Sequence, residues 1–449
     1  MQLTATGQSP WLLGLAGIVG AGLLYVLIQE VRKIPARLFT LMATAFLDMA
    51  GVLMIIPLMP FYVKELAGDD GVRIFGVSLG IGTLIGIIVS AFTIAQLASA
   101  PMWGRYSDKH GRRPALLIAL GASAISYLIF GFATSLVVLF LSRLVQGAGG
   151  GTVGVIQAYV ADSTEPADRA RALGWLSAAT NLGVALGPVL GSLAVTLGQQ
   201  DLWPGASEYR MGRAAPGVVA ALLCLTTMGF AWKYLKESRH DHVSDKPRPS
   251  SRAAAWRVLS HSSEPASRLI LIYAIAIGAF QGVNTVLALF LNRRFGVTAQ
   301  SIGVFFMYIG AISVFTRVLL LGRAVDHFGE ARLSRIGITL LTVGLLGMPL
   351  APNIGVLAIA VALLPLGTAF TFPCVTALLS RVIPNTERGL YMGLQQTFGG
   401  ASRVIAPLFF GWSFDAIGTS APYFFSASFV AATLLLGIGM DRYSAKPTS

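Results

Sequence analysis

The sequence GRYSDKHGRR, from Gly104 to Arg113, stands between two long apolar runs, and a weaker copy, GRAVDHFGEA, from Gly322 to Ala331, stands between two others. Both copies keep the spacing G-x-x-x-D-x-x-G, and their leading glycines lie 218 residues apart in a chain of 449 residues. Pro188 recurs as Pro407 at nearly the same offset. The pattern indicates an internal duplication, which is typical of secondary transporters built from two repeats.

Composition places this duplicated chain in a lipid bilayer. Hydrophobic residues make up 55% of it and charged residues 12%, and its mean hydropathy is +0.70, whereas charged residues make up about a quarter of a soluble domain. A transmembrane helix needs about 20 mainly apolar residues. We predict an all-α membrane fold of two six-helix bundles with pseudo-twofold symmetry, with spans at 38–62, 78–103, 114–132, 136–160, 172–197, 214–232, 269–291, 299–321, 336–351, 354–379, 390–413 and 420–440.

A further apolar run extends from Trp11 to Gln29. It lacks the positively charged start of a signal peptide, because the first basic residue is Arg32, after the run. We therefore predict an extra transmembrane helix with its N-terminus outside. The alternatives are a loosely attached interfacial helix and an incorrect start site. The predicted organisation is 1–37 for this helix and its connector, 38–232 and 269–440 for the bundles, 233–268 for a cytoplasmic linker and 441–449 for the tail.

A net charge of +13 could indicate a nucleic-acid partner, but the distribution of the charges explains it by membrane topology. With the N-terminus outside, 24 Lys and Arg residues fall in cytoplasmic connections, 6 in external ones and 3 inside spans. This asymmetry follows the positive-inside rule. It predicts a multi-pass protein of the cell membrane with a cytoplasmic C-terminus.

The string at Gly104 resembles the signature that the major facilitator superfamily carries between helices 2 and 3. The resemblance implies a latch that holds the two halves in the outward-facing state. Glycine at 104 permits close helix packing, Asp108 accepts hydrogen bonds at a helix N-terminus, and the basic residues stay in the cytosol. The alternative is a basic turn that obeys only the positive-inside rule. The predicted latch residues are Gly104, Arg105, Asp108, Gly111, Arg112, Arg113, Gly322, Asp326 and Gly329. The second latch should be weaker, because Glu330 and Ala331 replace the paired arginines.

Two further strings resemble patterns of the same superfamily. LFLSRLVQGAGGGTVG, from Leu139 to Gly154, is similar to its helix 4 pattern and places Arg143 inside a span, where an arginine is costly unless it is paired or hydrated. The alternative is an arginine that extends to the nearby interface. NLGVALGPVLGS, from Asn181 to Ser192, resembles the antiporter signature of helix 5 through Gly183, Gly187, Pro188 and Gly191. Ser192 replaces the last glycine of that signature, and a plain small-residue packing face is the alternative.

The first span carries the predicted chemistry. LDMAGVLMIIPLMPFYV, from Leu47 to Val63, resembles the first helix of drug/proton antiporters, and most of all that of the tetracycline/proton exporters. Asp48 is the only acidic residue within the thirteen apolar runs. Burial favours a protonated carboxyl group and a nearby arginine favours the ionised one, so a residue that alternates between the two can carry a proton. The resemblance gives Arg143 the role of that neighbour. Alternatively, Asp48 only caps or hydrogen-bonds the structure near the interface.

Other polar residues along the spans are candidates for a substrate cavity. Each amide is equally well explained as a contact between helices. The candidates are Gln96, Gln146, Gln157, Asn181, Gln281, Asn284, Gln395, Gln396 and Arg403. Arg403 favours an anionic, zwitterionic or metal-chelated substrate, unless it pairs with Asp415 or a carbonyl group.

Together these features predict a monomeric, proton-coupled secondary transporter that exports small amphiphilic molecules or drugs by alternating access. The proton gradient supplies the driving force, so no cofactor or metal is expected. The alternative is a proton-coupled or facilitative transporter of a metabolite such as a sugar, organic acid, siderophore or lipid. An enzyme is not expected, because all five histidines fall in predicted cytoplasmic connections. A substrate-sensing receptor is a further alternative.

Overall fold

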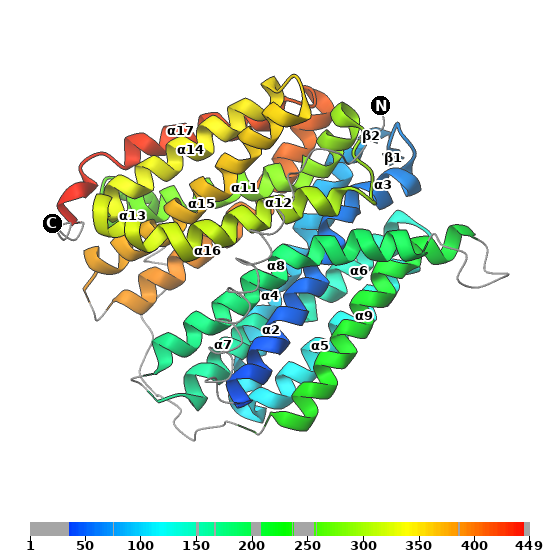
Figure 1. Ribbon diagram of the computed structural model, residues 1–449, viewed down its shortest axis with the longest axis horizontal. Helices are drawn as coiled ribbons and strands as arrows, with labels where there is room; N and C mark the ends of the chain where they lie inside the picture. The colour runs from blue at the N-terminus through cyan, green and yellow to red at the C-terminus, as the bar shows by residue number, and fades with distance from the viewer. Residues whose placement is uncertain are drawn as a thin grey trace, which may run out of the picture.

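The computed structural model describes residues 36–74, 76–149, 152–165, 168–198, 208–235, 237, 256, 258–384 and 387–443. The predicted helix at 11–29 lies outside these residues, as do much of the linker and the end of the tail. Almost all the described residues are helical, and the helices form two bundles (Figure 1).

The first bundle contains the helices before the linker. Its first span is α2 (Ala36–Ile55), which continues through the short helix η1 (Ile56–Leu58) into α3 (Met59–Ala67). A small antiparallel hairpin of β1 (Val72–Ile74) and β2 (Val77–Leu79) follows, with Val72 paired to Leu79. The remaining helices are α4 (Ile81–His110), α5 (Arg112–Gly131), α6 (Leu136–Gly149), α7 (Thr152–Ser163), α8 (Arg169–Gly198) and α9 (Glu208–Tyr234).

The second bundle repeats this arrangement after the linker. Its helices are α11 (Pro265–Phe295), α12 (Ile302–Phe315), η2 (Thr316–Leu320), α13 (Leu321–Phe328), α14 (Glu330–Leu350), α15 (Ile354–Val382), α16 (Arg388–Ala416) and α17 (Ala421–Leu436), followed by η3 (Met440–Tyr443). The segment η2 is a π-helical turn that joins α12 to α13. Ten helical stretches in the described ranges are long and apolar enough to cross a bilayer, and α17 is a shorter apolar helix. The 29-residue α16 is not among the ten; it carries Gln395, Gln396, Arg403 and Asp415.

The observed helices follow the predicted spans but extend further at the ends that carry the repeated string. The predicted loop from Gly104 to Arg113 is wrong. Gly104 to His110 form the last two turns of α4, and the chain turns at Gly111, whose φ is +105°. Gly329 makes the equivalent turn in the second copy with φ +71°. Both final glycines of the repeated spacing are therefore needed for a backbone conformation that other residues rarely adopt.

We call the end of the bundles that contains Gly111 and Gly329 the basic end. The most extensive contacts between the bundles are those of α4 with α16 and of α8 with α12, and α11 also contacts α4 and α3. Gly86 of α4 contacts the carbonyl oxygen of Pro407. In the other interface, a Cβ atom added at Gly303 of α12 would lie 2.8 Å from the carbonyl oxygen of Pro188. The repeated prolines thus occupy equivalent places in two equivalent interfaces. These contacts lie toward the opposite end, where the ribbons of the two bundles converge before they diverge toward the basic end (Figure 1).

Candidate functional site

Asp48 lies in the core of the first bundle. It is the thirteenth residue of α2, and only 2% of its surface is exposed. Tyr127 of α5 and Cys224 of α9 lie within electrostatic range of it. The Tyr127 ring packs against Gly51, one turn further along α2, where an added Cβ atom would lie 3.4 Å from the hydroxyl oxygen. Asp48 is therefore enclosed by other helices of its own bundle.

Arg143 shares this buried region through Tyr127. It lies two turns into α6, is 2% exposed, and its guanidinium is 5.0 Å from the centre of the Phe130 ring. The side chain therefore stays inside the bundle and does not extend to the interface. The Tyr127 hydroxyl is within electrostatic range of both Asp48 and Arg143. The structure thus joins the two predicted proton-coupling residues through a tyrosine that the sequence did not single out.

The groups around Tyr127 are incompletely hydrogen-bonded. Among the described residues, Arg143 Nη2 is buried and makes no hydrogen bond, and the buried Tyr127 hydroxyl lies close to the Gln146 side chain without a hydrogen bond of good geometry to it. Gln146 is 2% exposed, so its predicted place in a substrate cavity is wrong for this conformation. Buried polar groups without partners are costly, and each such group calls for an explanation. The cluster is therefore a candidate functional site.

The predicted antiporter motif forms the contact between α2 and α8. Gly183 contacts the carbonyl oxygen of Phe46, and Gly191 contacts that of Met54. A Cβ atom added at Gly187 would lie 2.7 Å from the carbonyl oxygen of Ala50. No side chain fits on this face of α8 without a shift of the backbone. The glycines therefore hold the helix that carries Asp48 against α8, while Pro188 faces α12.

A pocket of about 550 Å³ lies beside Asp48 but does not include it. Ala45 and Met49 of α2, Gln157 of α7, and Ser177 and Thr180 of α8 are among its lining residues. Gln157 is thus the predicted cavity residue that the structure brings to this pocket. Asn181 lies near it on α8 and donates a hydrogen bond of 2.8 Å to the carbonyl oxygen of Ser177.

The remaining cavity candidates lie on three other helices. Gln96 on α4 is half-buried, as are Gln281 and Asn284 on α11. Gln395 on α16 is fully buried and accepts a hydrogen bond of 3.4 Å from Thr376, so it does not line a cavity in this conformation. The neighbouring Gln396 is exposed. The predicted set therefore divides between buried contacts within a bundle and residues with open surface.

Arg403 is half-buried near the middle of α16 and donates a long hydrogen bond of 3.5 Å to the Tyr273 hydroxyl on α11. Its alternative partner, Asp415, is engaged elsewhere. The Asp415 carboxylate accepts hydrogen bonds from the backbone N–H groups of Gly82 at 3.0 Å and Thr83 at 2.7 Å, at the N-terminus of α4. The predicted alternative of an Arg403–Asp415 pair is therefore wrong.

Asp415 belongs to a pair of caps that join the two bundles at the opposite end. The other cap is Ser192 of α8, whose hydroxyl accepts a hydrogen bond of 2.8 Å from the Gly303 N–H at the start of α12. It donates another, also of 2.8 Å, to the carbonyl oxygen of Ala299. The serine that departs from the antiporter signature thus acquires a contact that glycine could not make.

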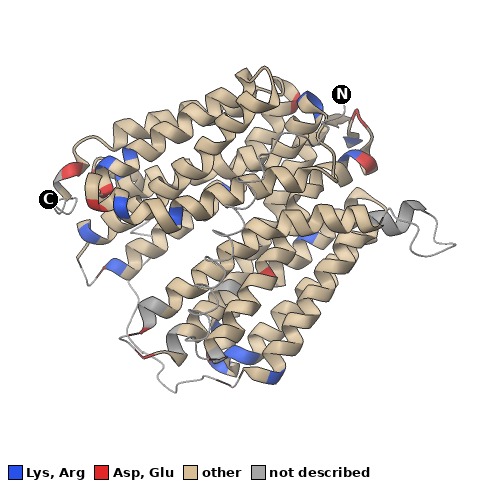
Figure 2. Cartoon of the chain, in the orientation of Figure 1, with Lys and Arg blue, Asp and Glu red and all other residues tan. Residues whose placement is uncertain are grey.

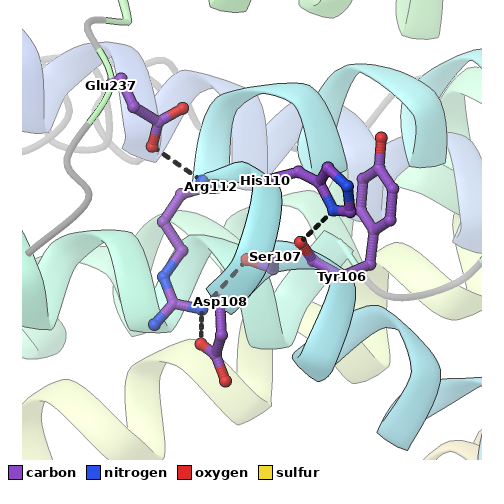
Figure 3. Close-up of polar contacts among 6 residues, drawn as sticks. All are labelled: Tyr106, Ser107, Asp108, His110, Arg112 and Glu237. Atoms are coloured by element: carbon purple, nitrogen blue, oxygen red, sulfur yellow. Dashed lines mark hydrogen bonds and ion pairs between the residues drawn. The ribbon is translucent and has the colours of Figure 1, made fainter. Parts of the chain in front are cut away.

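The first copy of the repeated string makes its polar contacts within its own bundle (Figure 3). Asp108 pairs with Arg112 at 2.6 Å, and Arg112 also donates to the Ser107 hydroxyl at 3.0 Å. Glu237, beyond the end of α9, accepts from the backbone N–H of Arg112 at 2.8 Å. The carboxylate of Glu237 therefore caps α5, the position that the sequence reading gave to Asp108.

The leading glycines of both copies lie in open space. A Cβ atom added at Gly104 or at Gly322 would meet nothing within 4 Å, so the predicted close helix contact at Gly104 is wrong in this conformation. The physical reason is that the basic ends of the bundles are apart, so the α4 face carrying Gly104 meets no helix.

The second copy has different ion pairs. Glu330 is 5% exposed and pairs with Arg381 at the end of α15. Arg335 of α14 forms two hydrogen bonds, of 2.9 and 2.6 Å, with Asp441 after α17. The residue that replaces an arginine of the first copy therefore ties two helices of the second bundle together.

The charged residues gather at the ends of the helices (Figure 2). The basic end carries most of the described arginines and lysines, with Arg105, Arg112, Arg113, Lys233, Arg268, Arg332 and Arg388 among them. Fewer arginines and lysines lie at the opposite end, where Lys64 pairs with Asp69 at 2.9 Å beside the hairpin. This asymmetry is the one that the sequence analysis assigns to the cytoplasm.

Comparison with known proteins gives the family of this two-bundle structure. The family profile described as Major Facilitator Superfamily matches residues 38–407, and matches again over residues 269–448. The chain belongs to the Major Facilitator Superfamily. The predicted family and fold are therefore confirmed, and both are those of transporters.

Individual relatives match over most of the chain. Multidrug resistance protein 2 of Bacillus subtilis (strain 168) is 27% identical over 405 residues, which cover 89% of this chain and 93% of that protein. Tetracycline resistance protein, class B, of Escherichia coli is 25% identical over 367 residues, which cover 81% of this chain and 85% of that protein.

Solved structures share the fold at lower identity. A bacterial homolog of the human lysosomal transporter Spinster, in an inward-facing and occupied conformation, superposes with a TM-score of 0.70 at 13% identity, covering 92% of this chain and 98% of that one. The human organic anion transporter MFSD10 (TETRAN) superposes with a TM-score of 0.62 at 22% identity, covering 90% of this chain and 100% of that one.

Proposed function

We propose that this protein is a proton-coupled exporter of small amphiphilic molecules, drugs included, that works by alternating access. The observation that carries the proposal is the buried cluster of Asp48, Tyr127 and Arg143 in the first bundle. An acid that is enclosed in a membrane-spanning bundle is costly to keep and marks a proton pathway. The names of the relatives, which are multidrug and tetracycline resistance proteins, support export of drugs.

The arrangement of the bundles supports the direction of the cycle. With the basic end in the cytoplasm, the conformation described here is inward-facing, since the bundles are joined at the opposite end by Asp415 and Ser192. Substrate then enters from the cytoplasmic side. After the bundles rock to open the external end, an external proton binds Asp48 and substrate leaves in exchange.

Reconstitution tests the proposal directly. The full-length protein is placed in liposomes with an acidic lumen and offered tetracycline, rhodamine 6G and carboxyfluorescein from outside. An antiporter accumulates its substrate under this gradient, because protons leave as substrate enters. We expect accumulation of at least one compound by the wild type and none by Asp48→Asn.

The matched control is Asp69→Asn, which removes an exposed carboxylate beside the hairpin and should transport like the wild type. Accumulation that requires an alkaline lumen would show symport. Equal accumulation by Asp48→Asn and the wild type would refute the assignment of Asp48.

A further inference from the structure

Arg403 faces the space between the bundles. On α16, Gly399 and Ser402 contact Tyr273 and Gly278 of α11, whereas Gly400 contacts Leu97 of α4. With 100° between successive residues of a helix, Arg403 falls in the narrow arc between these two contact faces. The exposed apolar residues Ile405, Leu408 and Trp412 occupy the wide arc on the other side, where lipid lies. Gln396, seven residues before Arg403, shares the narrow arc with it and is exposed.

Among the described residues, Arg403 forms no ion pair with an acidic side chain. In the described part of the second bundle, the acidic residues lie at the ends of the helices: Glu264, Asp326, Glu330, Glu387 and Asp441 at the basic end and Asp415 at the opposite end. Asp415 caps α4, Glu330 pairs with Arg381, and Asp441 pairs with Arg335. The Tyr273 hydroxyl at 3.5 Å is the polar contact that the structure gives to the Arg403 guanidinium.

An arginine in this place is costly unless something compensates its charge. The cost of a charged side chain at membrane depth is at least a few kcal/mol, and such residues face water-filled paths or bind partners. A guanidinium offers parallel N–H groups that match the two oxygens of a carboxylate, sulfonate or phosphate. It also repels a cation that approaches the same arc.

We propose that Arg403, supported by Tyr273, is the binding site for the anionic group of the substrate. The substrate class is an amphiphilic anion or zwitterion that carries a carboxylate, sulfonate or phosphate group. Its remaining part would extend along α16 toward Gln396 and the basic end. This inference rests on the proposed function, since it names the substrate of that transporter.

A pair of xanthene dyes with opposite charges tests the assignment. Binding of anionic carboxyfluorescein and cationic rhodamine 6G to the purified full-length protein is measured by fluorescence anisotropy, without a gradient. We expect Arg403→Gln to weaken carboxyfluorescein binding about tenfold, the lower end of what loss of a hydrogen bond to a charged group costs. Arg403→Lys should recover part of the affinity, because lysine restores the charge without the parallel N–H groups of the guanidinium. Rhodamine 6G should bind either variant at least as well as the wild type.

Arg332→Gln is the matched control, because Arg332 is exposed on α14 and its loss changes the net charge equally. Failure of the wild type to bind carboxyfluorescein would overturn the proposal, as would an unchanged affinity in Arg403→Gln or an equal loss for both dyes. Failure of the proposed function would look different, because dye binding would persist while gradient-driven accumulation was absent.

Discussion

At the scale of single residues, the proposed proton coupling depends on the surroundings of the Asp48 carboxyl group in the first bundle. The residue is enclosed by its own bundle, and the pocket beside it is lined by its neighbours Ala45 and Met49. A proton on Asp48 would therefore be separated from this pocket by one face of α2. This favours coupling through movement of the helix over direct competition between proton and substrate for one site.

Arg143 should set the pH at which Asp48 exchanges its proton. The positive charge of Arg143 favours an ionised carboxylate, so Arg143→Ala should let Asp48 bind a proton at higher pH. We expect the pH optimum of transport to move upward in this variant and to stay near the wild-type value in Arg143→Lys. Transport rates measured between pH 5 and 9 in proteoliposomes would show the shift. An identical pH profile in a folded Arg143→Ala protein would leave Arg143 only a structural role.

Single residues also show how far the sequence alone could reach. Asp48 and Arg143 were predictable because charges inside apolar spans are rare and costly. Tyr127 was not, because a tyrosine in a span usually packs like any other aromatic residue and only the fold brings it within electrostatic range of both charges. The partner of Asp415 was also out of reach, since Thr83 lies 332 residues earlier in the chain.

At the scale of elements, small residues determine which helices form close pairs. The glycine stripe of α8 contacts the backbone of α2, and Gly174 on the same helix faces open space. The spacing of the stripe was readable in the sequence, but its partner was not. A repeat of glycines predicts a packing face, but it does not indicate which helix packs there.

Replacing two glycines of α8 by alanine, one at a time, separates the effect of close packing on stability from that of helix propensity. Gly187→Ala places a Cβ atom 2.7 Å from the carbonyl oxygen of Ala50 and should destabilise the protein by about 1–3 kcal/mol, as overpacking does. Gly174→Ala meets no atom within 4 Å and should be neutral or stabilising by up to about 1 kcal/mol, because alanine favours the helix. Thermal unfolding in detergent measures both. A loss of stability in Gly174→Ala that matches that of Gly187→Ala would contradict the packing account.

At the scale of the whole molecule, each conformation should be held by contacts at one end. The caps of Asp415 and Ser192 join the bundles at the opposite end in the structure. Asp108 has its partner within its own bundle, which is the arrangement expected when the latch at the basic end is open. Contacts made in only one conformation shift the balance by their differential energy.

Substitutions at the two ends should therefore shift the conformational balance in opposite directions. Asp415→Ala removes a cap made in the conformation of the structure and should lower its population, whereas Asp108→Ala removes the predicted latch of the other conformation and should raise it. Asp326→Ala, in the weaker copy, should act like Asp108→Ala but less. Distances between spin labels at exposed sites, Val77 with Ile354 and Trp232 with Arg332, report the two ends. Shifts in the same direction for Asp415→Ala and Asp108→Ala would rule out this division of roles.

Proton movement driven by substrate shows whether Asp48 exchanges a proton for each passage of substrate. Proteoliposomes with a trapped pH indicator and no initial pH gradient are given an inward gradient of a transported compound. The account predicts that the lumen becomes alkaline with the wild type, since protons leave as substrate enters, and that its pH stays constant with Asp48→Asn. Acidification by the wild type, or alkalinisation of equal rate in Asp48→Asn, would contradict it.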